Sequence, residues 1–342
     1  MNGQNASNIE TPPQVDEATA AGGAVKARLR KVLGAREAGL AAVLVLLVLF
    51  LMWRSPYFLT ASNLTVVSRQ IALTLIIAIG MTFVILAGQI DLSVGSVVAL
   101  VSVLTGIFMV NMNLPVVVAA ILAVMAGAAV GLTNGTIFAN TKIPSFVVTL
   151  GMLAVARGLA LGITQGSTIS GLPSGFLVLG QGSWFGVPIP VWIAVGVALI
   201  AHAVLTRTVF GRHVYFLGSN EEAAVLSGIR IRRVKIAIFV IASSLAAVEA
   251  VIETARLSVG QPSAGTGYEL AAIGAVVIGG ANLFGGEGSI LGTVFGATLL
   301  ALIQNGLILL GISAYWQQVF SGAIIILAVG LNMWRRQREG RA

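Results

Sequence analysis

The 342-residue sequence contains no cysteine and only two histidines, His202 and His213. The absence of cysteine excludes disulfide bonds and thiolate metal sites. The two histidines lack the neighbouring ligands that a metal centre requires, so no metal site is predicted. Charged residues make up only 9% of the chain, whereas hydrophobic residues make up 57%. This composition is typical of an integral membrane protein and not of a soluble one.

Lysine and acidic residues are scarce as well. None of Lys26, Lys31, Lys142 and Lys235 lies in the glycine-rich motif that holds the phosphates of ATP, so the chain has no P-loop of its own. The acidic residues of the apolar regions lie toward the ends of the apolar runs, and not at mid-membrane, where a proton- or sodium-coupled carrier needs them. Both absences favour a transporter whose energy comes from another protein.

Long apolar runs recur along the chain, and a helix needs about 20 such residues to cross a bilayer. The predicted fold is therefore an all-α integral membrane protein with about ten transmembrane helices over residues 39–334. A disordered, basic tail is predicted over 1–38 and a short basic tail over 335–342. The eighth run is short and rich in glycine, which predicts a broken or tilted helix. The ten predicted spans are 39–53, 71–88, 93–110, 114–139, 144–163, 189–205, 236–254, 271–284, 290–311 and 315–333.

The 20 lysine and arginine residues give the chain a formal net charge of +8. They gather at the termini and in the loop 206–235, a pattern that sets membrane topology and does not indicate a nucleic-acid partner. With a cytoplasmic N-terminus, sixteen of them flank inner ends of spans and three, Arg54, Arg69 and Arg256, flank outer ends. The positive-inside rule therefore predicts that both termini and the loop 206–235 are cytoplasmic.

Two segments share a pattern: AIGMTFVILAGQIDLSVGS over 78–96 and AIGAVVIGGANLFGGEGS over 272–289. Each begins with Ala-Ile-Gly and ends with Gly-Ser after a polar turn rich in glycine. Both segments are predicted to run from outside to inside, which would make a duplication a parallel repeat of two halves. The alternative is a chance match in a chain that contains 41 glycines.

The cytoplasmic segment GRHVYFLGSNEEAAVLSGIR, residues 211–230, is unusually polar for this chain. Asn220 can cap a helix, Glu221 and Glu222 suit its positive N-terminal end, and Gly228 can end it. The predicted helix has about two turns, roughly 12 Å, and is too short to be stable without a surface to pack on. Either it docks on a partner protein, through Val225, Leu226 and two alanines, or it is an ordinary loop that fixes topology.

Polar residues within or beside the spans are candidates for a translocation path, because such groups are costly in lipid. The alternative for Asp91 is a helix cap, and for Glu249, Glu253 and Arg256 a cluster of ion pairs at a helix end. Amides suit a neutral polyhydroxylated solute, but they also hold helices together, as the segment 127–135 would. The candidate path residues are Asp91, Asn134, Gln261, Tyr268, Glu269, Asn282, Gln304 and Asn305.

Five segments carry a resemblance to a known family: GRHVYFLGSNEEAAVLSGI, AGQIDLSVGSVVAL, IPSFVVTLGMLAVARGLA, ARLSVGQPSAGTGYELAAIGAVVIGG and GSILGTVFGATLLALIQNGLILLGIS. Over residues 55–332, in order along the chain, the sequence resembles the ribose, xylose, arabinose and galactoside type of permease in bacterial ABC importers. The resemblance implies a non-enzymatic, multi-pass subunit of the bacterial inner membrane that pairs with a second permease copy or a paralogue.

The resemblance also implies a periplasmic sugar-binding protein and a cytoplasmic ATPase as partners, with ATP and Mg²⁺ bound by the ATPase and no cofactor bound by this chain. It assigns the loop to coupling of ATP hydrolysis to transport. The candidate coupling residues are Gly211, Asn220, Glu221, Glu222, Ala223, Ala224, Leu226 and Gly228.

Two departures from the family pattern are Ala271, where an acidic residue is expected, and Glu287, where a basic one is usual. The first leaves the solute open, and the second alters the cytoplasmic contact. A permease for a branched-chain amino acid, a nucleoside or an autoinducer-type sugar is the alternative within ABC importers. A stand-alone secondary carrier is the alternative outside them.

Overall fold

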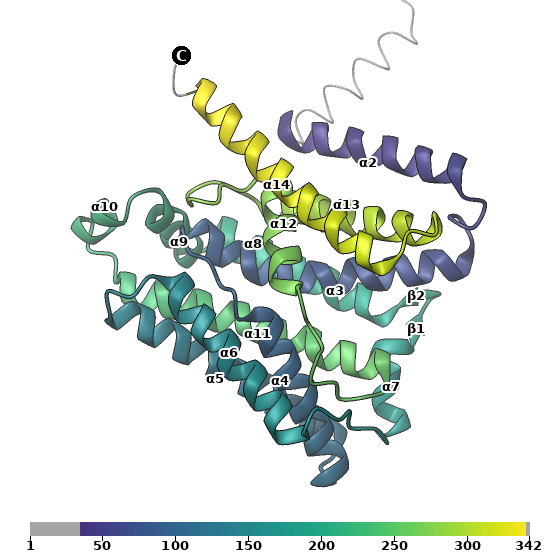
Figure 1. Cartoon of the computed structure of the whole chain (residues 1–342). Helices are drawn as coiled ribbons and strands as arrows, with labels where there is room; N and C mark the ends of the chain where they lie inside the picture. Colours follow the sequence, from purple (N-terminus) through teal and green to yellow (C-terminus); the bar gives the residue numbers. More distant parts are fainter. Residues whose placement is uncertain (1–34, 340–342) are drawn as a thin grey trace, which may run out of the picture.

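The computed structural model of the chain describes residues 35–339 (Figure 1), so residues 1–34 of the tail predicted over 1–38, and residues 340–342, lie outside the described part. Helices account for most of the described part. They are α2 (Ala35–Arg54), α3 (Ala61–Leu86), α4 (Val94–Gly106), the π-helix η1 (Ile107–Asn111), α5 (Val116–Asn140), α6 (Ser145–Thr164), α7 (Ser174–Gln181), α8 (Ile189–Arg207), α9 (Val209–Ser219), α10 (Glu221–Leu226), α11 (Ile231–Leu257), α12 (Tyr268–Ile278), α13 (Ile290–Leu309) and α14 (Ala314–Glu339). The strands β1 (Ser183–Trp184) and β2 (Val187–Pro188) form an antiparallel hairpin.

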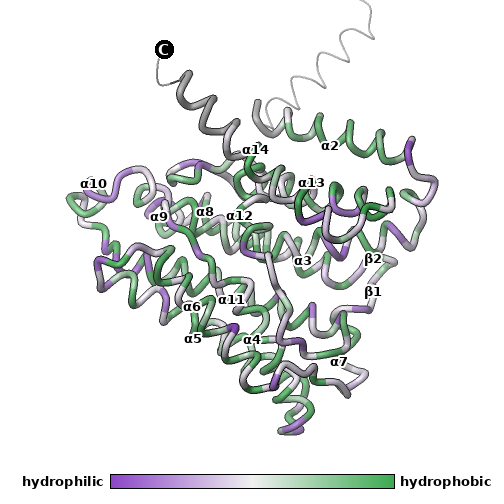
Figure 2. The backbone as a smooth tube through the Cα atoms, viewed as in Figure 1, coloured by the Kyte–Doolittle hydropathy of each residue, from purple (hydrophilic) through white to green (hydrophobic). Residues whose placement is uncertain are grey.

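Seven of these helices are long and apolar enough to cross a membrane: α3, α4 with η1, α5, α6, α8, α11 and α13. Two shorter apolar helices, α2 and α12, and the helix α14 take the places of the other three predicted spans. Figure 2 shows that hydrophobic residues dominate the helices, while polar residues gather at their ends and in the connections. The predicted all-α membrane fold is confirmed.

Several predicted boundaries were wrong. Helix α3 begins at Ala61, ten residues before the predicted span, where Thr60 caps it by accepting a hydrogen bond from the Asn63 N–H. Helix α12 ends at Ile278, short of residue 284, because the chain turns at Gly279 and Gly280, the latter with φ of 92°. Helices α2 and α14 both extend into the stretches predicted as tails.

Helices α3 and α11 form the centre of the bundle. Most of their apolar residues are buried, whereas α5, α6 and α8 expose most of theirs and form an outer layer. The core includes Ile76, Ile79 and Met81 from α3 and Ile238 and Phe239 from α11. In a bilayer, each outer helix satisfies its backbone through its own hydrogen bonds. Its outward-facing apolar side chains are then suited to contact with lipid.

Close contact between α5 and α11 depends on three glycines spaced four residues apart, Gly127, Gly131 and Gly135. A methyl group at Gly131 would fall on the carbonyl oxygen of Phe239, and one at Gly135 would lie 2.7 Å from the Cα of Ile236. Small residues at this spacing let helix backbones approach in a membrane. In this segment, the structure therefore shows packing between helices and not a lined path.

The two segments that share a sequence pattern have the same arrangement, a helix, a turn and a second helix: α3 and α4 for one, α12 and α13 for the other. Their turns touch, because the Gly286 N–H donates a 2.9 Å hydrogen bond to the Leu86 carbonyl. An ancestral duplication stays a prediction, but the two corresponding turns do lie side by side.

We expect Gly131→Ala to destabilise the protein by about 1–3 kcal/mol, because the added methyl group forces α5 away from α11. The matched control is Gly151→Ala on α6, where an added Cβ has no neighbour within 4 Å. There, better helix propensity should leave the melting temperature in detergent unchanged or slightly higher. Equal melting temperatures for the two variants would contradict close packing at Gly131.

Candidate functional site

The predicted coupling segment forms an arm of two helices, α9 and α10, at one edge of the molecule (Figure 1). Helix α9 begins sharply after α8: the Thr208 hydroxyl accepts a 3.1 Å hydrogen bond from the Gly211 N–H. A side chain at Gly211 would overlap the carbonyl oxygens of Val204 and Leu205. Gly211 therefore allows the arm to fold back tightly on the end of α8.

Helix α10 has the predicted cap and end. The Asn220 side-chain oxygen accepts a 2.9 Å hydrogen bond from the Ala223 N–H, and Gly228 follows the helix with φ of 75°. The helix has six residues, about 9 Å, and is shorter than the two turns predicted. Ala224 is buried against the chain itself, whereas Leu226 is 89% exposed. Leu226 is the apolar residue most available to a partner.

The two glutamates of α10 differ in their surroundings. The Glu221 carboxylate accepts a 2.7 Å charge-assisted hydrogen bond from the Lys235 ammonium at the start of α11. That ammonium also lies 4.6 Å from the centre of the Phe138 ring. Glu222 is exposed. Of these two candidate coupling residues, Glu221 fastens the arm to α11, whereas Glu222 is exposed and available to a partner.

The inner side of the arm rests on a contact that we call the glycine junction, formed by Gly88, Gly218, Gly285 and Gly286. A methyl group at Gly218 would overlap the Leu86 carbonyl oxygen and lie 2.7 Å from the Gly286 nitrogen. Nearby, the Tyr215 hydroxyl donates a 2.9 Å hydrogen bond to the Gly288 carbonyl. Burial raises the pKa of the Tyr215 phenol, so the hydroxyl keeps the proton that it donates. The arm thus touches both corresponding turns at once.

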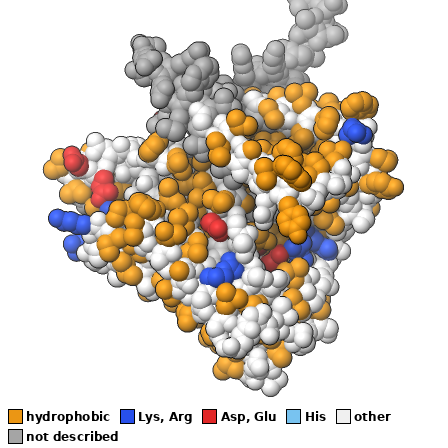
Figure 3. Space-filling model, in the orientation of Figure 1, with side chains coloured by type: hydrophobic (Ala, Val, Ile, Leu, Met, Phe, Trp, Pro, Cys, Tyr) orange, Lys and Arg blue, Asp and Glu red, His pale blue; other side chains and the backbone are white. Residues whose placement is uncertain are grey.

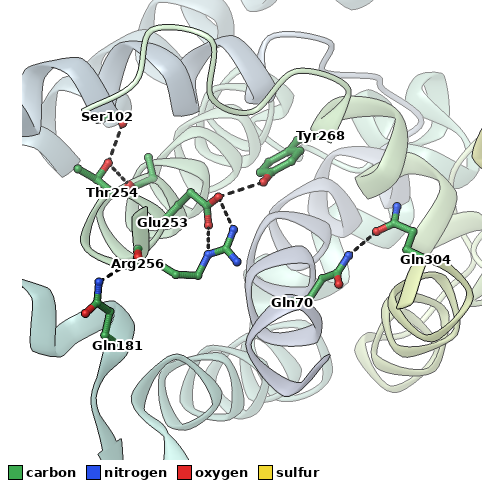
Figure 4. Close-up of polar contacts among 9 residues, drawn as sticks. Gln70, Ser102, Gln181, Glu253, Thr254, Arg256, Tyr268 and Gln304 are labelled. Carbon is green, nitrogen blue, oxygen red and sulfur yellow. Dashed lines mark hydrogen bonds and ion pairs between the residues drawn. The ribbon is translucent and has the colours of Figure 1, made fainter. Parts of the chain in front are cut away.

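At the opposite end of the bundle, side chains from five helices form a polar cluster: Gln70, Gln181, Glu253, Arg256, Tyr268 and Gln304 (Figure 4). The Arg256 guanidinium donates to both carboxylate oxygens of Glu253, at 2.8 and 2.7 Å, and the Tyr268 hydroxyl lies 3.4 Å from one of them. The Gln70 amide donates to the Gln304 side-chain oxygen at 2.6 Å. These groups combine donors and acceptors, and all but the buried Glu253 are at least partly exposed to solvent.

Charged side chains are few on the face shown in Figure 3, where hydrophobic side chains cover most of the surface. The charges gather near α10 and around the middle of the face.

Arg157 donates hydrogen bonds to the carbonyls of Pro262 and Ala264, at 2.9 and 2.8 Å. Arg157 therefore holds the loop that precedes α12, a role that the sequence did not reveal.

Glu249 lies one turn before Glu253 on α11 and is fully buried. Neither of its carboxylate oxygens has a hydrogen-bond partner among the described residues. The predicted cluster of ion pairs was therefore correct for Glu253 and Arg256 and wrong for Glu249. A buried carboxylate without a partner is costly, so it is the least satisfied polar group in this part of the helix.

Most of the other candidate path residues have local structural contacts. Asp91 accepts hydrogen bonds from the N–H and the hydroxyl of Ser93, the residue before α4, at 2.8 and 2.6 Å, and so bonds locally just ahead of the helix without capping its first turn. Asn134 donates to the same hydroxyl at 2.9 Å. Asn305 pairs with Asn63 through two amide hydrogen bonds, at 2.8 and 3.2 Å. The structure thus does not bring Asp91, Asn134 and Asn305 to the polar cluster.

Asn282, Gln261 and Glu269 lie apart as well. Asn282 closes the turn after α12 by donating to the Gly285 carbonyl at 2.6 Å. Gln261 bonds to Ser263 in the loop before α12. Glu269 approaches Gly95, on the side of α12 that faces α4. Of the eight predicted path residues, Tyr268 and Gln304 belong to the polar cluster.

Residues 63–329 match the family described as "Branched-chain amino acid transport system / permease component". The chain belongs to this permease family. The match spans the arm, the glycine junction and the polar cluster, so the permease has all three within its family domain. No solved structure matches the permease.

Curated relatives of the permease cover nearly its whole length. It is 44% identical over 294 residues to the ribose import permease of Escherichia coli K12, a match that covers 84% of this chain and 90% of the relative. The ribose import permease of Bacillus subtilis is 43% identical, with the same coverage. The D-allose permease of Escherichia coli K12 is 37% identical over 81% of this chain and 85% of the relative.

We expect Glu253→Gln to lower the stability of the permease by about 2 kcal/mol, because it leaves the Arg256 guanidinium without its carboxylate. The expected loss is smaller than for a fully buried ion pair, because the Arg256 side chain is partly exposed. Glu249→Gln is the matched variant four residues away and removes a charge that has no partner. It should keep or raise the melting temperature in detergent. A drop as large as that of Glu253→Gln would mean that Glu249 is paired.

Proposed function

We propose that this permease is the membrane subunit of an ATP-binding-cassette importer for a monosaccharide. The observation that carries the proposal is the similarity, over more than four fifths of the chain, to permeases named for ribose and D-allose. The chain itself performs no chemistry in this proposal and binds no cofactor. A separate cytoplasmic ATPase binds ATP and Mg²⁺, and a periplasmic binding protein delivers the sugar.

The proposed orientation places the end of the bundle that carries α10 in the cytoplasm of a bacterial inner membrane. Six basic residues between Arg207 and Lys235 lie at this end, and Arg54, Arg69 and Arg256 lie at the other. This difference agrees with the positive-inside rule. The polar cluster and the β1–β2 hairpin then face the periplasm, where the binding protein docks.

We further propose that α10 is the contact with the ATPase. Leu226 and Val225 project from the arm, and Glu222 adds an exposed charge beside them. A force on α10 passes through α9 to the glycine junction, where backbone meets backbone with no flexible side chain between. The two turns at the junction lead into α3, α4, α12 and α13, and three of these helices carry residues close to the polar cluster.

The polar cluster is the proposed first contact of the sugar with the permease. Its amides, hydroxyl and ion pair offer both donors and acceptors, as a ring of hydroxyl groups requires. Gln70 and Gln304 bond to each other, so each can exchange its partner for a sugar hydroxyl at little cost. In the assembled importer, a second copy of this chain or a paralogue completes the path.

An amino-acid importer is the second candidate, because the ion pair of Glu253 with Arg256 offers one group of each charge to a zwitterion. Competition uptake distinguishes the two candidates: unlabelled ribose, allose or xylose should reduce uptake of the labelled sugar, and leucine should not. Transport by the purified chain alone in proteoliposomes would contradict the requirement for an ATPase.

We expect Leu226→Lys combined with Glu222→Lys to reduce co-purification with the ATPase and sugar uptake by at least about tenfold, because central apolar anchors carry much of an interface's binding energy. Ile143→Lys is the control, since Ile143 is also exposed at the α10 end but lies outside the arm. Full uptake by the double variant would rule out α10 as the ATPase contact.

We expect Gln304→Leu to reduce sugar uptake several-fold while leaving the melting temperature near that of the wild type, because Gln304 is partly exposed in the polar cluster. Asn305→Leu, at the adjacent position, should instead lower the melting temperature, since Asn305 is buried and pairs with Asn63. Uptake that is insensitive to Gln304→Leu would make the Gln70 pair a helix contact only.

A further inference from the structure

A pocket of about 510 Å³ opens between α9, the turn after α10 and the first turns of α11. Its lining combines the polar or basic side chains of His213, Arg230 and Arg233 with the apolar side chains of Phe210, Val234 and Ala237. The volume falls within the range of small-molecule sites in proteins. Gly228, a candidate coupling residue, also borders the pocket, but the six side chains named here belong neither to the proposed sugar path nor to the proposed ATPase contact.

The two arginines of the lining carry positive charge that the described part of the chain does not neutralise. Neither Arg230 nor Arg233 forms an ion pair with a described residue, and both side chains are exposed. Glu221, on α10, is paired with Lys235 of α11 and so does not pair with either arginine. Two guanidinium groups beside an open pocket favour a phosphate, which arginine binds through paired hydrogen bonds.

The apolar lining residues indicate which kind of phosphate compound fits the pocket. Inorganic phosphate gains nothing from Phe210, Val234 or Ala237, whereas a phospholipid places its glycerol and first acyl carbons against such a surface. Apolar residues are also exposed on α9 itself, where Val209 is 55% and Phe216 39% exposed. Exposed apolar residues beside basic ones are typical of the boundary between lipid tails and headgroups.

We propose that this pocket binds the headgroup of an anionic phospholipid. The phosphate lies against Arg230 and Arg233, and the start of the acyl chains lies against Phe210, Val234 and Ala237. Basic pockets between membrane helices suit such headgroups, and each basic residue adds to the attraction. The pocket is bordered by Ser227–Arg230, the segment that joins α10 to α11, so a bound lipid holds the base of the arm. The site does not depend on which solute is carried.

Native mass spectrometry of the full chain in detergent tests the proposal, with phosphatidylglycerol and phosphatidylcholine of the same acyl chains as probes. The wild type should bind phosphatidylglycerol more tightly than phosphatidylcholine. Arg230→Gln with Arg233→Gln should weaken phosphatidylglycerol binding by roughly tenfold or more. Arg232→Gln is the matched control, since Arg232 is exposed on the same turn but does not line the pocket, and it should stay within about twofold of the wild type.

A second variant, Ala237→Phe, keeps both arginines and places a bulky side chain in the pocket. It should also weaken phosphatidylglycerol binding, and it decides the question if the arginine variant does not fold, as judged by gel filtration and melting temperature. An equal loss in Arg232→Gln would show a diffuse basic surface and overturn the pocket. Equal binding of the two lipids would overturn the anionic ligand. Displacement by millimolar inorganic phosphate, together with no effect of Ala237→Phe, would show a site for a soluble anion.

Discussion

Direct contact between backbones is the constraint on which the rest of this permease depends. In a bilayer, helices gain little by hiding apolar surface from lipid, so they associate by close packing and by hydrogen bonds. Glycine makes this packing possible between α5 and α11, and again between α12 and α13, where a methyl group at Gly296 would overlap the Ala275 carbonyl oxygen. The glycine junction uses the same contact to join the arm to two turns. A single added methyl group at any of these places separates whole helices.

Hydrogen bonds between distant side chains set the register of the glycine-packed helices. Thr82 and Thr293 join α3 to α13 at 2.8 Å, and Ser102 and Thr254 join α4 to α11 at 2.7 Å. Such pairs are satisfied internally, as the low dielectric of the interior requires. Among the described residues, Glu249 is the buried carboxylate with neither oxygen bonded, and the hydroxyl of Ser243 on the same helix is also buried without a partner. The polar cluster differs in another way: its groups are paired, and all but Glu253 are at least partly open to solvent.

Local signals in the sequence predicted what is local in the structure. Hydropathy located the spans, and the cap at Asn220 and the glycine at position 228 located α10. The start of α3 was predicted ten residues late, after the polar residues Arg69 and Gln70, which lie within the helix. The structure accommodates them through residues far along the chain: Gln304 accepts from Gln70, and the Gln181 carbonyl accepts from Arg69 at 2.5 Å. Pairings across more than 100 residues leave no periodic pattern, so Gln70 was missed as a member of the polar cluster and Asn305 was placed in the path.

The two surfaces of the arm are constrained differently by the rest of the chain. Leu226 is 89% exposed, so its own chain places little constraint on the side chain at this position. Gly218 faces the Leu86 carbonyl and tolerates no larger residue without a backbone shift. The exposed side of the arm can therefore change without disturbing the backbone contact behind it. With α10 as the proposed ATPase contact, a different ATPase could be accommodated by altering a few exposed positions and leaving the interior of the membrane domain untouched.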